Sequence, residues 1–309
     1  MNPIKRCAVL TSGGDAPGMN TAIRAVVKVA AQKGTRVFGV ENGYDGLIDA
    51  RFRELTRSFD ERPERLFPPA EIDRIVRFGG TVLGSARSSR FLSVEGRRKA
   101  AKALSDFDGL IVIGGNGSLT GAHALATEHG ISVVGIPASI DNDIGCTGTS
   151  IGVDTALNTI VEACDRISDT ARAHRRAFIV EVMGRDCGYL AMASAIAAGA
   201  DGVLFREQGR SEHEVVLAVE ELICRGFSSA RNKQHVLIIK SEGVQIPCTR
   251  LVKSLERRLE TVLPGVEIRG TVLGHLVRGG SPTYLDRMVA GRLAYGAVES
   301  LAAGASDEM

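Results

Sequence analysis

The stretch LTSGGDAPGMN, residues 10–20, joins an apolar run at Cys7–Leu10 to a helical pattern that begins at Asn20. A glycine-rich turn between a strand and a helix lets backbone N–H groups approach phosphate oxygens, and the helix N-terminus adds a partial positive charge. The turn has neither the G-x-G-x-x-G spacing of a dinucleotide site nor the Gly-Lys-Ser/Thr ending of a Walker A loop. Taken alone, it indicates either a phosphate site or a tight connection.

Two further turns follow apolar runs in the same way: GGNGS at 114–118 and PASIDND at 137–143. Because the carboxyl ends of parallel strands meet at one edge of a doubly wound sheet, where such sheets bind ligands, we expect the three turns to lie together. The third turn carries Asp141 and Asp143, which suit the binding of a metal ion or the removal of a proton from an alcohol. An exposed polar loop is the alternative interpretation.

Short β-branched runs alternate with longer helical patterns along most of the chain, which predicts an α/β fold of parallel sheets covered by helices, in two units. The segment at 60–70, DERPERLFPPA, holds three prolines and predicts a surface excursion. The expected strands are Cys7–Leu10, Arg36–Val40, Leu110–Ile113, Ser132–Ile136, Ala177–Met183, Gly202–Phe205, His235–Ile239 and Ile268–Val272. The expected helices are Asn20–Gln32, Leu119–Thr127, Asp154–Ala171, Leu190–Ala198, Glu212–Cys224, Arg250–Val262 and Tyr284–Leu301.

The composition excludes several classes of function. The 309 residues include 38 Lys and Arg against 36 Asp and Glu, a near balance that argues against a nucleic-acid binder. No apolar stretch approaches the roughly 20 residues of a membrane helix, and the first ten residues lack a signal-peptide pattern. The 6 cysteines show no CxxC spacing, so no zinc or redox site is indicated. We expect a cytoplasmic protein with neither a nucleic-acid nor a membrane partner.

These turns, together with motifs over nearly the whole chain, resemble the phosphofructokinase family. The resemblance implies two α/β lobes, each a mainly parallel sheet flanked by helices, with the active site in the cleft between them. The nucleotide-binding lobe is expected at 1–140 and the sugar-phosphate-binding lobe at 141–309, and a crossing of the chain between lobes near the C-terminus is left open. The motifs are LTSGGDAPGMN (10–20), GGTVLGSAR (79–87), IGGNGS (113–118), SIDND (139–143), EVMGR (181–185) and TVLGH with RGGSP (271–282).

The resemblance implies ATP-dependent phosphorylation of fructose 6-phosphate to fructose 1,6-bisphosphate, the glycolytic step, by in-line transfer. In this assignment Asp141 is the general base for the attacking hydroxyl, Arg87 neutralises charge during transfer, and Asp143 also belongs to the catalytic group. Mg²⁺ accompanies ATP, with Asn116 and Asp143 at the metal. The expected ATP-binding residues are Gly14, Arg87, Ser88, Gly115, Asn116, Gly117 and Ser118.

The resemblance also implies a sugar-phosphate site that is shared between subunits of a homotetramer. Arg176 and Arg269 are expected to reach the phosphate from a neighbouring subunit, and arginine forks suit phosphate because they bind it bidentately. The remaining expected substrate-binding residues are Ser139, Ile140, Asp141, Met183, Gly184, Arg185, Glu242, His275 and Arg278.

Two family positions favour ATP over pyrophosphate as the donor. Pyrophosphate users of the family tend to have aspartate and lysine at the positions of Gly117 and Ala138, where these side chains would crowd the α-phosphate of ATP. The family pattern also implies allosteric control through basic residues that include Arg24, Lys28 and Arg57. Ser168 departs from that pattern, because the regulated bacterial enzymes carry an arginine there.

Asn116 is the largest departure from the family, which has aspartate at this metal-site position. Asparagine keeps one carbonyl oxygen but loses the negative charge, so magnesium would bind more weakly. Three interpretations stay open: an active enzyme with reduced metal affinity, a low-activity or non-catalytic sugar-phosphate sensor, and a substitution introduced to slow turnover. A pyrophosphate-dependent kinase is the further alternative. A nicotinamide dehydrogenase is excluded, because the fingerprint of that class is absent.

Overall fold

The computed structural model describes residues 4–56, 72–231 and 233–309, so the expected excursion at 60–70 and Arg57 lie outside the described residues. The chain forms two compact units. The first comprises Met1–Ser139, Ile144–Thr155 and Arg278–Met309, and the second comprises Ile140–Asp143 and Ala156–Val277. The expected ranges 1–140 and 141–309 differ from this division mainly at Ile144–Thr155 and at the last 32 residues, from Arg278 onward, which belong to the first unit. The second difference is the crossing near the C-terminus that the resemblance left open.

The first unit is built on a five-stranded sheet with the order β3-β2-β1-β4-β5. All neighbouring pairs are parallel except β2 with β3. The four parallel strands confirm the predicted ones to within two residues at each end, whereas β3 was missed because it has only three half-buried residues. The strands are β1 (Arg6–Ser12), β2 (Arg36–Val40), β3 (Phe52–Glu54), β4 (Gly109–Gly114) and β5 (Val133–Pro137).

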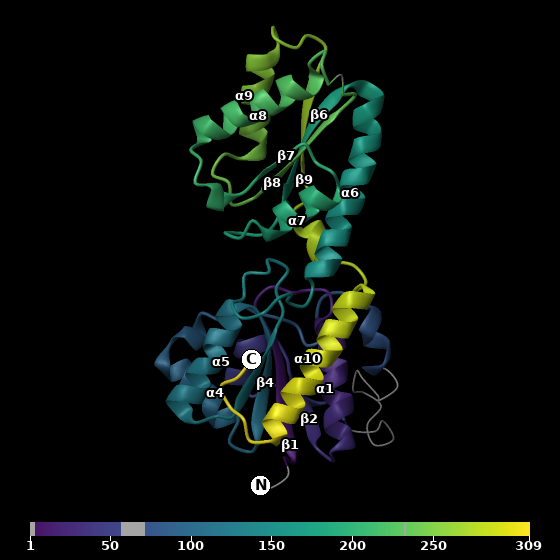
Figure 1. Cartoon of the computed structure of the whole chain (residues 1–309). Helices are drawn as coiled ribbons and strands as arrows, with labels where there is room; N and C mark the ends of the chain where they lie inside the picture. Colours follow the sequence, from purple (N-terminus) through teal and green to yellow (C-terminus); the bar gives the residue numbers. More distant parts are fainter. Residues whose placement is uncertain (1–3, 57–71, 232) are drawn as a thin grey trace. The chain divides into compact units, whose positions relative to one another are not determined.

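Helices cover both faces of this sheet (Figure 1). On one face α1 (Met19–Gln32) packs against α10 (Tyr284–Ala302). On the other face Leu47, Ala100 and Leu125 join one apolar core with strand residues such as Leu110. These three side chains come from α2 (Gly43–Ile48), α4 (Val94–Ala103) and α5 (Asn116–His129), and the short 3₁₀ segments of this unit are η2 (Arg74–Arg77) and η3 (Arg90–Leu92).

The second unit has a four-stranded, fully parallel sheet with the order β7-β8-β6-β9. Two helices cover one face through a common apolar core, and α9 contributes the stripe Leu251, Leu255 and Leu259. The other two helices lie on the opposite face (Figure 1). The strands are β6 (Arg176–Val182), β7 (Gly202–Leu204), β8 (Val236–Ser241) and β9 (Glu267–Val272). The helices are α8 (Glu212–Phe227) and α9 (Cys248–Leu259) on the first face, and α6 (Val153–His174) and α7 (Tyr189–Ala197) on the other; η4 (Arg206–Gln208) and η5 (Gly274–Arg278) are 3₁₀ segments.

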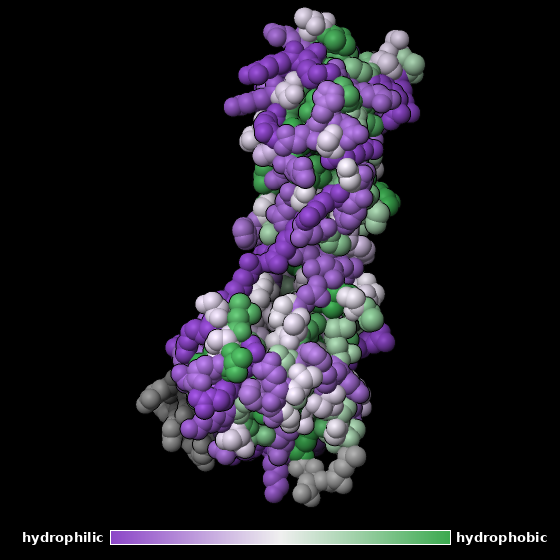
Figure 2. All heavy atoms as spheres, turned by 90° about the vertical axis from the view of Figure 1, so that its left-hand side faces the viewer, coloured by the Kyte–Doolittle hydropathy of each residue, from purple (hydrophilic) through white to green (hydrophobic). Residues whose placement is uncertain are grey.

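The face shown in Figure 2 is largely hydrophilic, and its apolar side chains form small scattered groups. Helix α9 illustrates the pattern, because its leucines are buried while Arg250, Arg257 and Arg258 are exposed. In the part of the chain that the structure describes, no helix combines the length and the apolar character needed to cross a bilayer.

One buried carboxylate joins α10 to the start of α6 within the first unit. Asp286 is 0 % exposed, and its Oδ1 accepts a hydrogen bond from the Gly152 N–H at 2.8 Å. Its Oδ2 accepts from the backbone N–H of Thr155 at 2.8 Å and from the Thr155 hydroxyl at 2.5 Å. Burial raises the pKa of this carboxyl group, and the hydrogen bonds from Thr155 and Gly152 oppose that shift. The contact supplies acceptors to N–H groups that have no partner within the first turn of a helix.

Replacing this acceptor tests the connection. Asp286→Ala is expected to lower the free energy of unfolding by about 1–3 kcal/mol, because three donors lose their buried partner. Asp169→Ala, which removes an exposed ion pair with Arg172 on α6, serves as the control and is expected to cost less than about 1 kcal/mol. Urea unfolding followed by circular dichroism measures both. Equal losses in the two variants would contradict the assigned role of Asp286.

Candidate active site

The three predicted turns follow neighbouring strands of the first sheet. Because β4 is paired in parallel with both β1 and β5, Ser12 lies opposite Gly114 and Gly114 lies opposite Pro137. A Cβ atom added to Gly115 would lie 3.7 Å from the Ser139 Cβ. The prediction that the turns converge at one edge is therefore confirmed for the residues of the first unit.

The turn after β4 leaves open space at the start of α5. The helix begins at Asn116 without a side-chain cap on Gly115, and both Asn116 and Gly117 are exposed. A Cβ added to Gly114 would lie 2.6 Å from the Ser12 carbonyl oxygen, so packing requires glycine there. A Cβ added to Gly117 would meet no atom within 4 Å, so packing does not require glycine at 117. The space beside Gly117 is therefore available to a ligand at a helix N-terminus.

Arg278 lies against the turn after β1. Its Nη1 donates a hydrogen bond to the Asp15 carbonyl oxygen at 3.3 Å, and the same atom lies 2.9 Å from a Cβ added to Gly14. The glycine at position 14 thus allows a guanidinium group to approach the backbone, which places a positive charge at a turn suited to anions. Arg278 belongs to the first unit. The range expected for the sugar-phosphate lobe included it, with a crossing of the chain near the C-terminus left open.

Arg87 is an exposed side chain at the end of a segment that is fastened to the turn after β1. The Thr11 hydroxyl donates to the Gly84 carbonyl oxygen at 2.9 Å, and the Ser85 hydroxyl donates to the Gly13 carbonyl oxygen at 2.6 Å. These two hydrogen bonds hold the backbone before Arg87 beside the glycine turn.

In the second unit, the carboxylate of Glu242 orders the turn after β6. Its Oε1 accepts hydrogen bonds from the N–H groups of Gly184 at 3.3 Å and Arg185 at 2.9 Å. Both residues have positive φ, 138° and 48°, and a Cβ added to Gly184 would lie 2.6 Å from the Cys187 carbonyl oxygen. The sequence had assigned Glu242 to the sugar hydroxyls only and gave no signal for this structural contact.

Asp141 is 5 % exposed, and its Oδ2 lies 3.8 Å from the Nε of Arg185. The two side chains lie far apart in the sequence, and the structure brings them together within the second unit. The Arg185 guanidinium beside this carboxylate suits a site where negative charge develops during a reaction. Among the other candidates in the second unit, Ile140 and Met183 are buried, whereas Asp143 and His275 are exposed.

Arg176 and Arg269 lie close together on adjacent strands, β6 and β9. The Arg176 Nε and the Arg269 Nη2 both donate to Oε2 of Glu267, at 2.7 and 3.0 Å. These guanidinium groups, Arg176 first, hold the pKa of Glu267 below its usual range. The resemblance assigned both arginines to one phosphate, and their shared carboxylate shows that one small anion can contact both. Binding to a neighbouring subunit's substrate stays a prediction.

The described residues contain no group of three His, Cys, Asp or Glu side chains that would form a metal cage. Magnesium needs no such cage, because it keeps water and substrate phosphates in its shell and often takes only one or two protein oxygens. Asn116 offers an amide oxygen and Asp143 a carboxylate, and both side chains are exposed. Asn116 belongs to the first unit and Asp143 to the second. Each residue offers one oxygen, and one protein oxygen can suffice for a magnesium ion that is held mainly by a nucleotide.

Two of the basic residues expected in an allosteric site share one carboxylate. Arg24 and Lys28 bind Asp73 at 2.8 and 2.9 Å, and the pKa of Asp73 is lowered, chiefly by Lys28. In the second unit Lys233 forms an ion pair with Asp201. The pair at Asp73 brings two basic groups together, and a regulatory role for Arg24 and Lys28 stays a prediction.

The sequence gave no signal for a buried ion pair in the second sheet. Lys240 on β8 is 0 % exposed and lies opposite Glu181 on β6. Its Nζ donates to Oε2 of Glu181 at 2.7 Å and to the Ser241 carbonyl oxygen at 3.1 Å. The pair joins the strands directly before the turns that carry Arg185 and Glu242. The sequence does not show whether a lysine within an apolar strand is buried or exposed, because that depends on which strand pairs with it.

Breaking this pair should destabilise the second unit. Lys240→Met is expected to cost about 3 kcal/mol, because it leaves the largely buried Glu181 carboxylate without its cation. The double variant Lys240→Met, Glu181→Met is expected to recover most of that loss, because both charges are then removed. Lys253→Met, at an exposed position on α9, is the control. Urea unfolding measures all three; a double variant as unstable as the single one would contradict the pairing.

Comparison with known proteins identifies the family of this chain. The family model described as phosphofructokinase matches residues 6–301. The ATP-dependent 6-phosphofructokinase of Thermotoga neapolitana is 45% identical over 309 residues, 99% of this chain and 89% of that protein. The enzyme of the same name from Clostridium acetobutylicum is 45% identical over 303 residues, 97% of this chain and 87% of that protein.

Solved structures show the same fold. The phosphofructokinase of Saccharomyces cerevisiae matches with a TM-score of 0.82 and 35% identity over 96% of this chain, which spans only 41% of that longer chain. A pyrophosphate-dependent phosphofructokinase of Nitrosospira multiformis matches with a TM-score of 0.81 but 19% identity, over 98% of this chain and 78% of that chain, and so speaks to the fold alone. On its sequence, its fold and its glycine turns, this chain belongs to the phosphofructokinase family.

Proposed function

We propose that this protein transfers the terminal phosphoryl group of ATP to fructose 6-phosphate, giving fructose 1,6-bisphosphate in glycolysis. The observation that carries the proposal is the pair of glycine turns at the ends of β1 and β4, with open space at Gly117 on the N-terminus of α5. Relatives that are 45% identical and are named ATP-dependent 6-phosphofructokinases support the same reaction.

The space at Gly117 favours ATP as the donor. Since packing within the protein leaves that side of the residue empty, glycine there keeps room for the α-phosphate of a nucleotide. An aspartate side chain would fill this space with a like charge, and pyrophosphate has no α-phosphate to accommodate. The pyrophosphate-dependent neighbours share only 19% and 20% of their residues with this chain.

The donor residues act by positioning and by charge neutralisation, as phosphoryl transfer requires. Backbone groups of Gly14, Gly115 and Ser118 border the phosphates, and Ser88 borders the nucleotide. The Arg87 guanidinium neutralises charge that develops during in-line transfer. Magnesium held by Asn116 and Asp143 would supply further neutralisation of the phosphates.

On the acceptor side, Asp141 accepts the proton of the attacking sugar hydroxyl. Arg185, with its cation beside Asp141, contacts the sugar together with Met183 and Gly184, and Glu242 accepts hydrogen bonds from sugar hydroxyls with the oxygen that its own turn does not use. His275 and Arg278 bind the sugar phosphate. Arg176 and Arg269 complete that site from a neighbouring subunit, in a cytoplasmic homotetramer.

Asn116 supports a second candidate, a sugar-phosphate sensor with little or no turnover. The neutral amide offers magnesium a weaker ligand than a carboxylate, while the acceptor-side residues are retained. The two candidates differ in turnover and share the expectation that fructose 6-phosphate binds.

Removing the proposed base tests the reaction. Asp141→Asn is expected to lower kcat by about 10²–10⁴-fold, because the amide cannot accept the hydroxyl proton, with the KM for ATP nearly unchanged. Asp186→Asn is the control, since it changes an exposed carboxylate of the same unit that pairs with Arg206. Steady-state kinetics with ATP and fructose 6-phosphate measure both. A kcat within threefold of the parent would remove Asp141 from the role of base.

Restoring a carboxylate at the metal position tests the magnesium assignment. Asn116→Asp is expected to lower the magnesium concentration for half-maximal velocity by about tenfold, which corresponds to about 1.4 kcal/mol from one added charge near the ion. The control is Gln32→Glu, which adds the same charge at the C-terminal end of α1, about 20 Å along that helix from the glycine turn after β1. Magnesium titration at saturating ATP gives the values. An unchanged half-saturation would place the metal elsewhere.

A further inference from the structure

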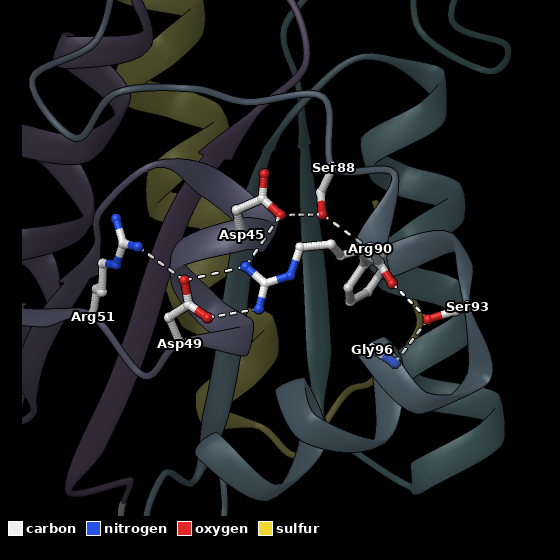
Figure 3. Close-up of polar contacts among 8 residues, drawn as sticks. Asp45, Asp49, Arg51, Ser88, Arg90, Ser93 and Gly96 are labelled. Carbon is white, nitrogen blue, oxygen red and sulfur yellow. Dashed lines mark hydrogen bonds and ion pairs between the residues drawn. The ribbon is translucent and has the colours of Figure 1, made fainter.

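The segment that carries Arg87 is also fastened on its carboxyl-terminal side, by contacts that the family motifs do not include. The Ser88 hydroxyl donates to Oδ1 of Asp45 at 2.5 Å and accepts from the N–H of Phe91 at 3.1 Å (Figure 3). Ser88 therefore joins the start of η3 to α2. Only Ala86 and Arg87 separate it from the backbone that Thr11 and Ser85 hold.

A second contact lies beside the first in Figure 3. The two terminal nitrogens of Arg90 contact the two carboxylate oxygens of Asp49, Nη2 to Oδ1 at 2.7 Å and Nη1 to Oδ2 at 3.2 Å. Arg90 lowers the pKa of Asp49 more than any other group does, and Asp49 raises the pKa of Arg90. A bidentate fork of this kind fixes orientation as well as distance.

Helix α2, which carries Asp45 and ends directly before Asp49, is itself held by buried contacts. Tyr44 of α2 is 4 % exposed, and its hydroxyl donates to the Ser118 carbonyl oxygen at 2.6 Å. Its ring stacks on that of Phe91, with the ring centres 3.9 Å apart. Leu47 packs in the core of the first unit. Through α2, the turn after β4 and the segment around Arg87 are parts of one connected structure.

We propose that Asp45, Asp49 and Arg90 are positioning residues for phosphoryl transfer, which hold the Arg87 guanidinium at the donor phosphates. The inference rests on the proposed function. With Thr11 and Ser85 on one side and the α2 contacts on the other, the backbone at Arg87 is fixed at both ends while its side chain stays exposed to meet a ligand.

The exposure of these three side chains indicates that their contacts position Arg87 and contribute little to the stability of the fold. The side chains of Asp45, Asp49 and Arg90 are 32%, 29% and 51% exposed, so water screens their charges and the contacts contribute little to stability. A group that stabilises a transition state must be held within about 0.5 Å, and a misplacement of about 1 Å costs up to about 10²-fold in rate. Losing the contacts is therefore expected to change turnover much more than stability.

The test compares Arg90→Gln with Arg98→Gln, an exposed arginine on α4 that pairs only with Glu95 among the described residues. Arg90→Gln is expected to lower kcat with ATP and fructose 6-phosphate by about tenfold, with the KM for fructose 6-phosphate and the melting temperature nearly unchanged. Arg90→Lys, which keeps the charge and loses the fork, is expected to recover part of the loss. A kcat for Arg90→Gln equal to that of Arg98→Gln would overturn the inference.

A second measurement does not depend on turnover. Hydrogen exchange by mass spectrometry is expected to show faster exchange of the peptide spanning 84–93 in Arg90→Gln and in Asp45→Ala, by about tenfold, and no change in Arg98→Gln. Unchanged exchange overturns the positioning inference even in a fully active enzyme. A parent protein that lacks turnover, yet shows the expected exchange differences, overturns the proposed function and leaves the positioning of Arg87 supported.

Discussion

The parallel pairing of β4 with β1 on one side and β5 on the other is the constraint on which the first unit depends. It brings three successive turns to the same sheet edge, although about 100 residues of chain separate the first turn from the second. Each glycine turn is followed by a helix, so N–H dipoles point toward that edge. Remaining space there, as at Gly117, is then available to an anion, and Arg278 adds a positive charge beside the first turn.

The sequence predicted the elements whose signal is local. Strands of four to seven apolar residues and long amphipathic helices show their period directly, and all eight predicted strands are present within two residues. Helices α2 and α4 escaped prediction for opposite reasons. Helix α2 has six residues, two of them glycine, and only Gly96 and Ala100 of the charged α4 are buried, so neither shows an apolar stripe.

Contacts between distant side chains left no signal in the sequence. Lys240 becomes a buried cation only because β8 pairs with β6 at Glu181, and Glu242 orders the turn at Arg185 only because the two strand ends are adjacent. The same holds for Asp45 and Arg90, which the motifs did not include. The return of residues from Arg278 onward to the first unit depends on the packing of α10 against α1 and on the buried Asp286. Local pattern predicts elements, whereas tertiary pairing decides which polar groups meet.

These contacts hold backbone turns and guanidinium groups in place in the absence of a substrate. In the proposed site Asn116 is the exception, since a neutral amide stands where the family pattern has a carboxylate, while the surrounding glycine turn is kept. The most direct measurement is ³¹P NMR of the purified protein with magnesium and fructose 6-phosphate, supplied with either ATP or pyrophosphate. Fructose 1,6-bisphosphate and ADP are expected with ATP, and no product is expected with pyrophosphate. Product with pyrophosphate alone, or binding of fructose 6-phosphate without product from either donor, would contradict the proposed function.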